Sequence, residues 1–78
     1  NYRALDRTRR EQYDLRMGYI EFGRDDYDRA MTYFDRINPQ SEFYDHALYY
    51  KSYIAYAREQ YDWARSGFER LKARLTAR

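Results

Sequence analysis

The sequence contains no cysteine, one histidine, one proline and three glycines among 78 residues. Without cysteine, neither a disulfide framework nor a thiolate zinc site can form. No Ser-His-carboxylate set can be justified around His46, so we expect a surface or capping histidine. The sequence therefore predicts no catalytic residue and no enzyme activity.

Long apolar runs are also missing. No stretch is long enough to cross a bilayer, and the start Asn1-Tyr2-Arg3 lacks the apolar core of a signal peptide. We therefore expect no membrane partner.

Charge of one sign is not concentrated anywhere. Fifteen Lys and Arg stand against 13 Asp and Glu, giving a net charge of +2, whereas nucleic-acid binding usually needs a basic stripe. We interpret two weak basic clusters as solvated helix ends: Arg3, Arg7, Arg9 and Arg10, and Arg70, Lys72, Arg74 and Arg78. The acidic run Asp25-Asp26-Tyr27-Asp28 lacks the loop length and glycine of an EF-hand, so it is better interpreted as a helix cap, with no metal and no cofactor.

The sequence does contain a pattern that recurs 34 residues later, which is typical of a helical repeat protein. Each repeat of this length is one helix pair that must stack on a neighbour to bury its apolar face. The identical pairs are Tyr19/Tyr53, Ile20/Ile54, Arg24/Arg58, Tyr27/Tyr61, Asp28/Asp62, Ala30/Ala64, Phe34/Phe68 and Arg36/Arg70.

Turn and cap signals divide the chain into four helices and no strand. Thr8 and Glu11 have the spacing of a capping box, which predicts a first helix from about Arg9 to Gly23. A second helix begins near Tyr27 after Asp25 and Asp26 and stops at Asn38-Pro39. Ser41 is expected to cap a third helix that runs to about Arg58, and a fourth begins near Tyr61.

Short connections fold adjacent helices into antiparallel hairpins. We expect the small side chains of Ala30 and Ala64 to lie where the helices of each hairpin cross, with Phe34 and Phe68 filling the space beyond.

These residues resemble the tetratricopeptide repeat family. The first copy carries Met17-Gly18, Phe22, Tyr27, Ala30, Phe34 and Ile37, and the second carries Ser52, Tyr56, Tyr61, Ala64, Phe68 and Leu71. The resemblance implies an all-α fold, an α-α superhelix of four antiparallel helices in two hairpins. It implies one domain over 1–78, with a lead-in at 1–8, repeats at 9–40 and 41–75, and a tail at 76–78. The copies depart from the family at Asp14 and Leu48, where a large aromatic is common, and at Asp25 and Glu59, where the turn glycine is usual.

The resemblance also implies that the first helix of each pair lines a concave groove. The corresponding residues are Leu15, Tyr19, Phe22, Tyr49, Tyr53 and Tyr56. An alternative is that the 11 tyrosines mostly pack, because Tyr27, Tyr56 and Tyr61 occupy places that the family uses for its core. The Lys and Asn that clamp a chaperone's C-terminal carboxylate in some members are replaced by Leu15 and Tyr19, then by Tyr49 and Tyr53.

The resulting hypothesis is a non-enzymatic scaffold that binds a peptide or helix of a protein partner in an aromatic groove. The main alternative is a structural segment of a longer repeat array or a self-associating module, since two repeats leave two outer faces. A nucleic-acid-binding helical repeat is the least favoured class.

Overall fold

The structure is a computed structural model that describes residues 2–77, with side chains from Leu5 onward. Over these residues helices are the only regular secondary structure, which confirms the all-α prediction. They are α1 (Tyr2–Gly23), α2 (Tyr27–Phe34), α3 (Tyr44–Ala57) and α4 (Tyr61–Thr76). Asn1 and Arg78, the outermost residues of the predicted lead-in and tail, lie outside the described residues. No helix in the described part is long and apolar enough to span a membrane.

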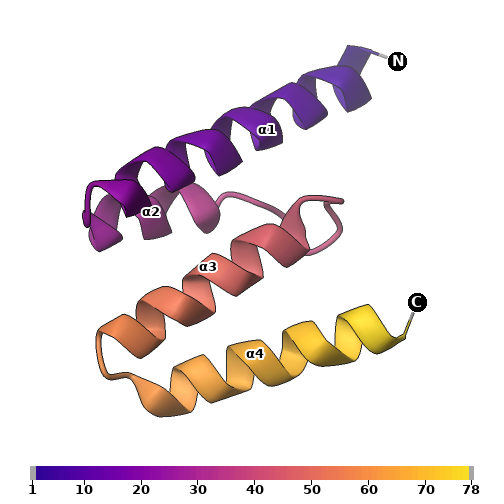
Figure 1. Cartoon of the computed structure of the whole chain (residues 1–78). Coiled ribbons are helices and arrows are strands. Elements are labelled where there is room, and N and C mark those ends of the chain that lie inside the picture. Colours follow the sequence, from indigo (N-terminus) through magenta and orange to yellow (C-terminus); the bar gives the residue numbers. More distant parts are fainter. Residues whose placement is uncertain (1, 78) are drawn as a thin grey trace.

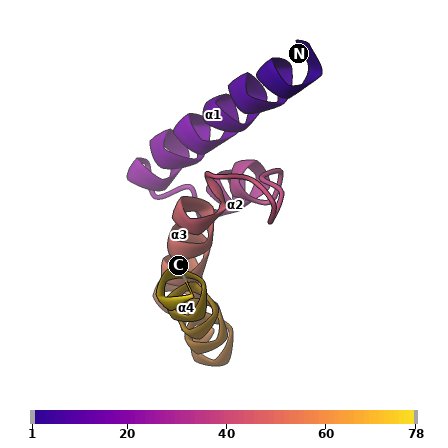
Figure 2. The same cartoon turned by 90° about the vertical axis from the view of Figure 1, so that its right-hand side faces the viewer.

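The helices form two antiparallel hairpins, α1 with α2 and α3 with α4 (Figure 1), and the hairpins meet mainly through α2 and α3. Seen from the side, the helices follow one another in chain order (Figure 2). The Cα atoms span 41 × 33 × 13 Å, so the molecule is much thinner along one axis than along the other two. Every helix has exposed residues along its length.

Both hairpin turns have the same hydrogen bonds, 34 residues apart. In the first turn, the Asp26 amide donates to the Glu21 carbonyl (2.9 Å) and the Asp25 amide to the Phe22 carbonyl (3.0 Å). This is the Schellman pattern, which needs a left-handed residue at its second-to-last place. Asp25 supplies it with φ of 62°, and Glu59 does so in the second turn with the same angle. The second turn repeats both bonds, Gln60 to Ala55 (2.8 Å) and Glu59 to Tyr56 (3.0 Å).

Helix α1 begins at Tyr2, so the predicted start near Arg9 is wrong. Thr8 lies inside the helix, and the Thr8-Glu11 spacing is not a capping box here. The physical reason is that residues 2–8 contain neither glycine nor proline and include Ala4 and Leu5, which favour helix. The end of α1 at Gly23 is confirmed.

Helices α2 and α3 both differ from prediction at the connection between them. Helix α2 ends at Phe34, because the Arg36 and Ile37 amides bond three residues back rather than four, a tightened turn that leads away from the helix. Helix α3 begins at Tyr44, and Ser41 is not its cap. The Ser41 hydroxyl accepts from the Phe43 amide (3.0 Å) within the preceding turn, which leaves Phe43 at the N-cap with no side-chain bond.

The core lies along α2 and α3, and the crossing of each hairpin contains a glycine. Phe34 and Ile54 are the largest fully buried side chains. A Cβ at Gly18 of α1 would overlap the Phe34 ring, and one at Gly67 of α4 would overlap the Ser52 side chain. In each hairpin a glycine lets the two helices approach closely. The glycine lies on the first helix of the first hairpin and on the second helix of the second hairpin.

We predict that Ala30→Leu and Ala64→Leu each lower the free energy of unfolding by about 1–3 kcal/mol, because bulk added at a packed crossing forces side chains from their rotamers. Ala30 and Ala64 are 0% and 3% exposed, whereas Ala57 is exposed. Ala57→Leu is therefore the matched control and should change stability little. Thermal melts followed by circular dichroism measure the difference, and equal shifts for all three variants would contradict these crossings.

The caps of α2 and α4 yield a second prediction. The Asp26 carboxylate accepts from the Arg29 amide (3.1 Å), whereas Gln60 makes no side-chain cap bond. Gln60→Asp should raise the free energy of unfolding by about 1 kcal/mol, and Asp26→Gln should lower it by a similar amount. Chemical denaturation measures both changes. No gain from Gln60→Asp, alongside a loss from Asp26→Gln, would show that the two turns are not equivalent.

Candidate interaction surface

Tyr50 of α3 packs against three aromatic rings of the first hairpin. Its ring centroid lies 4.9 Å from that of Tyr19, 5.2 Å from Phe22 and 5.8 Å from Phe34, with a stacked geometry in the last pair. Tyr19 and Phe22 belong to α1 and Phe34 to α2. Ring pairs at 4.5–7 Å stabilise beyond the area that they bury, so these contacts hold α3 against the first hairpin.

A continuous row of rings leads from this junction to the surface. Phe22 lies 5.5 Å from Tyr53, Tyr53 lies 6.5 Å from Tyr56, and Tyr56 lies 5.6 Å from Tyr61. Tyr53 is 42% exposed, and Tyr56 and Tyr61 are each 57% exposed. The rings of Tyr53, Tyr56 and Tyr61 therefore each pack against a neighbouring ring, which restricts their orientation.

The six predicted groove residues divide into two groups. Leu15, Tyr19 and Phe22 are half-buried against the core, so packing describes them well. Tyr49, Tyr53 and Tyr56 are exposed. The alternative that the tyrosines mostly pack fits Tyr27, which is half-buried against the core, whereas Tyr56 and Tyr61 are each 57% exposed.

Two hollows lie elsewhere on the molecule. One of about 490 Å³ lies between α2, α3 and α4 beside Trp63, which is 76% exposed. The other, of about 420 Å³, lies between the start of α3 and the end of α4 and is lined by Tyr49. The other five predicted groove residues line neither hollow. Tyr53 and Tyr56 thus form an aromatic face outside both.

Tyr19 has a perturbed phenol at the base of this face. Burial raises the pKa of the Tyr19 phenol above its ordinary value of 10.0, and the adjacent Tyr50 raises it further. The neutral, hydrogen-bonding form therefore persists to higher pH than in an exposed tyrosine.

Sequence reasoning missed three buried carboxylates on α1. Asp14 is 2% exposed and lies 3.4 Å from Arg36, and Glu21 is 3% exposed and lies 3.2 Å from Arg24. Glu11 is 8% exposed, and its Oε2 has no hydrogen-bond partner. The available signal was the contrast between repeats, since Asp14 and Glu21 correspond to the apolar Leu48 and Ala55.

The basic clusters are only partly solvated helix ends. Arg7, Arg9, Arg10, Arg70 and Lys72 are exposed. Arg74 instead donates to Asp45 (2.6 Å) and lies over the Tyr44 ring at 4.8 Å, so it fastens α4 to α3. The Arg3 side chain and Arg78 lie outside the described residues.

His46 and the acidic run at residues 25–28 were the other candidates for ligand chemistry in the sequence. His46 is an exposed residue in the first turn of α3. Asp26 of the acidic run caps α2. No group of three or more His, Asp or Glu side chains that could hold a metal ion occurs among the residues that the structure describes.

No family model matches the chain, and neither a curated protein nor a solved structure matches it.

The Tyr19 phenol predicts a loss of stability at alkaline pH. Because its pKa is raised on folding, the unfolded chain releases this proton first, and stability falls as pH rises from about 10 through the folded pKa. Tyr19→Phe should therefore lose less stability between neutral and alkaline pH than the wild type. Tyr13→Phe, at a 56% exposed ring, is the control. Chemical denaturation across pH measures the slopes, and identical slopes for both variants would contradict a role for Tyr19.

Proposed function

We propose that this chain is a tetratricopeptide-like protein-interaction module, non-enzymatic, that binds a peptide or helix of a partner protein through the aromatic side of α3. The 34-residue period supports the family proposal, because it recurs in the turn hydrogen bonds and in the starts of α2 and α4 at Tyr27 and Tyr61. The period alone is the sequence signature of such repeats.

The observation that carries the proposal is the exposure of Tyr49, Tyr53 and Tyr56 on one helix. They are 42–57% exposed, yet each has a neighbouring ring at 5.2–6.5 Å. Because neighbouring rings already restrict these side chains, they lose little conformational entropy when a partner covers them. A tyrosine also offers both apolar area and a hydroxyl for hydrogen bonding.

Binding at this surface should draw on apolar burial more than on charge. The net charge of the chain is only +2, so counterion release of the kind that drives polyanion binding has little basis here. The contacts that dominate protein interfaces are most often Trp, Tyr and Arg. Tyr49 and Tyr53 are therefore the expected anchors.

The test is selection of peptides from a displayed library on the folded protein. Binding of selected peptides should weaken by about 2 kcal/mol in Tyr53→Ala, as expected for an anchor. Tyr49→Ala should also weaken it, and raised salt should change it little. Tyr13→Ala is the matched control, because Tyr13 is exposed to a similar extent but lies on α1.

Two results would contradict this function. One is a set of selected peptides that bind equally well to Tyr49→Ala and Tyr53→Ala. The other is an affinity that collapses between low and physiological salt, which would favour a polyanion partner.

A further inference from the structure

The junction between the two hairpins contains a charge pair whose residue types recur at the 34-residue offset. Arg58, at the end of α3, donates from Nη2 to the Asp28 carboxylate of α2, and its guanidinium lies 5.9 Å from the centroid of the Tyr27 ring. The same pattern is present in both repeats. At the 34-residue offset, Arg58 corresponds to Arg24, Tyr27 to Tyr61 and Asp28 to Asp62, and the residue type is the same in each pair.

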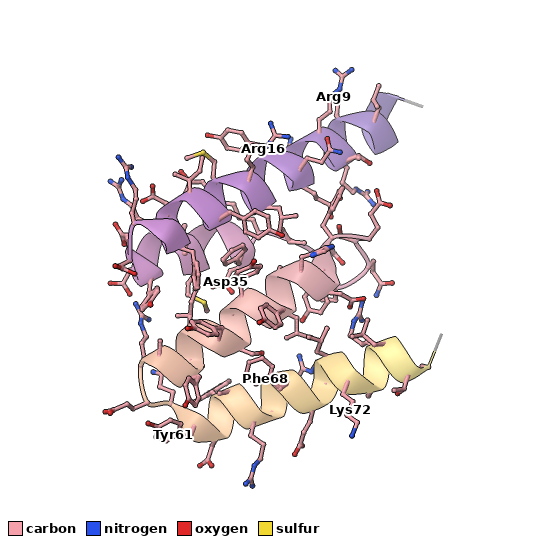
Figure 3. All side chains as sticks on the ribbon, in the orientation of Figure 1. Arg9, Arg16, Asp35, Tyr61, Phe68 and Lys72 are labelled. Atoms are coloured by element: carbon pink, nitrogen blue, oxygen red, sulfur yellow. The ribbon has the colours of Figure 1, made fainter. Side chains whose placement is uncertain are left out.

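The chain therefore repeats the donor and the acceptor of this junction at positions that the internal junction does not join. Tyr61 and Asp62 are exposed at the start of α4, and Figure 3 shows Tyr61 at the outer edge of the second hairpin. Arg24 follows α1 at the opposite end of the helix order, with 71% of its side chain exposed. One hairpin presents the acceptor and the other presents the donor.

Aromatic residues around this acceptor are repeated as well. On the first hairpin, Tyr50 packs against Tyr19, Phe22 and Phe34. Their counterparts on the second hairpin are Tyr53, Tyr56 and Phe68, of which the first two are exposed and Phe68 is half-buried. We call these exposed residues, together with the half-buried Phe68, the tail face: Tyr53, Tyr56, Tyr61, Asp62 and Phe68.

The outer side of α1 corresponds to the side of α3 that covers the first hairpin. Ile54 of α3 is 1% exposed, whereas its identical counterpart Ile20 is 45% exposed. Arg16 takes the place of Tyr50, and Figure 3 shows it on the side of α1 that faces away from the other helices. We call this set the head face: Arg16, Ile20 and Arg24.

We propose that the head face of one copy docks on the tail face of a second copy, with Arg24 of one chain paired to Asp62 and Tyr61 of the next. The second copy is the occupant that supplies the same arginine, at the same repeat position, that the internal junction uses for Asp28 and Tyr27. Ile20 then takes the buried place that Ile54 has within the chain. The proposal requires no peptide partner, so it is independent of the proposed function.

Arg16 can occupy the aromatic site that Tyr50 fills within the chain. Arginine binds the face of a tyrosine ring within about 6 Å, and Arg36, Arg58 and Arg74 each make this contact at 4.8–5.9 Å from the ring centroids. Arg16 over Tyr53 and Tyr56 repeats that chemistry.

Three differences make contact between copies weaker than the internal junction. The Lys51–Asp35 ion pair (2.8 Å) has no counterpart, because Met17 and Glu69 occupy those positions. Tyr13 replaces the buried Ala47, which keeps the helices further apart. Glu21 also competes for Arg24 at 3.2 Å. Exposed ion pairs contribute little alone, so the aromatic side chains supply most of the attraction.

The contact joins two different faces, so it is heterologous. Such contacts form rings if the rotation closes and open stacks if it does not. The internal junction already relates successive hairpins in one direction, as the side view shows (Figure 2). Repetition of that step gives a growing head-to-tail stack.

Sedimentation equilibrium of the full chain and of charge-exchange variants tests the proposal. The wild type should show an average mass above the 9.8 kDa monomer that rises with concentration up to about 1 mM. Arg24→Asp and Asp62→Arg should each reduce association. An equimolar mixture of the two should recover it, because the carboxylate introduced at position 24 of one variant can then pair with the guanidinium introduced at position 62 of the other. Arg7→Asp and Glu42→Arg carry the same charge changes at exposed residues outside both faces, and they should leave association unchanged.

A repair variant provides the converse test. Arg16→Tyr with Met17→Lys restores the ring and the second cation of the internal junction, and it should tighten association by about tenfold. Circular dichroism confirms that each variant keeps its helices. The proposal is overturned if the wild type and the repair variant both remain monomeric. It is also overturned if the mixture of charge variants associates no more than either variant alone.

Discussion

The seating of Tyr50 among the rings of the first hairpin is the interaction that makes one unit out of two hairpins. Helix α2 is a short helix, and the hairpins meet mainly through α2 and α3, where Ala47, Leu48 and Ile54 share one buried cluster with Ala30, Phe34 and Ile37. Tyr19, Phe22 and Phe34 surround Tyr50 at 4.9–5.8 Å, and the Lys51–Asp35 and Arg58–Asp28 pairs lie on the same junction. Tyr50 packs against the buried cluster, and its neighbour Phe22 also begins the aromatic row that continues through Tyr53.

Local signals in the sequence predicted the hairpin turns well because these turns are made from local bonds. Asp26 is both the end of one Schellman turn and the cap of the next helix, so its type restricts the backbone directly. The predicted start of α1 was wrong because Thr8 and Glu11 have the spacing of a capping box, but no helix-breaking residue precedes them. Residues 2–8 favour helix, so the helix continues through Thr8. The prediction that Ser41 caps α3 was wrong because a serine hydroxyl can accept from a backbone amide in a turn as well as at the start of a helix. A motif of two residues does not decide between those uses.

The candidate surface was predictable in composition but not in burial. The repeat placed Leu15, Tyr19, Phe22, Tyr49, Tyr53 and Tyr56 on equivalent helices, and equivalence alone treats each pair alike. The structure separates them, because α3 covers Tyr19 and Phe22 while nothing in the described part of the chain covers Tyr53 and Tyr56 in the same way. Exposure is therefore set by position in the stack, a property that no window of sequence contains. The buried carboxylates Asp14 and Glu21 show the reverse case, where one repeat differs from the other and the difference itself marks the site.

The two proposed uses of the aromatic side of α3 share residues and so compete. Tyr53 and Tyr56 belong both to the peptide surface and to the tail face, and one pair of rings cannot be covered twice. Tyr49 is not part of the tail face, although its ring packs on Phe68 of that face at 6.0 Å. It lines the hollow between the start of α3 and the end of α4, away from Asp62 at the other end of α4. A partner that also engages Tyr49 gains area that a second copy does not use. The free concentration of this chain sets the extent of stacking and the free concentration of the partner sets the extent of partner binding, so the ratio of the two decides which contact covers these rings.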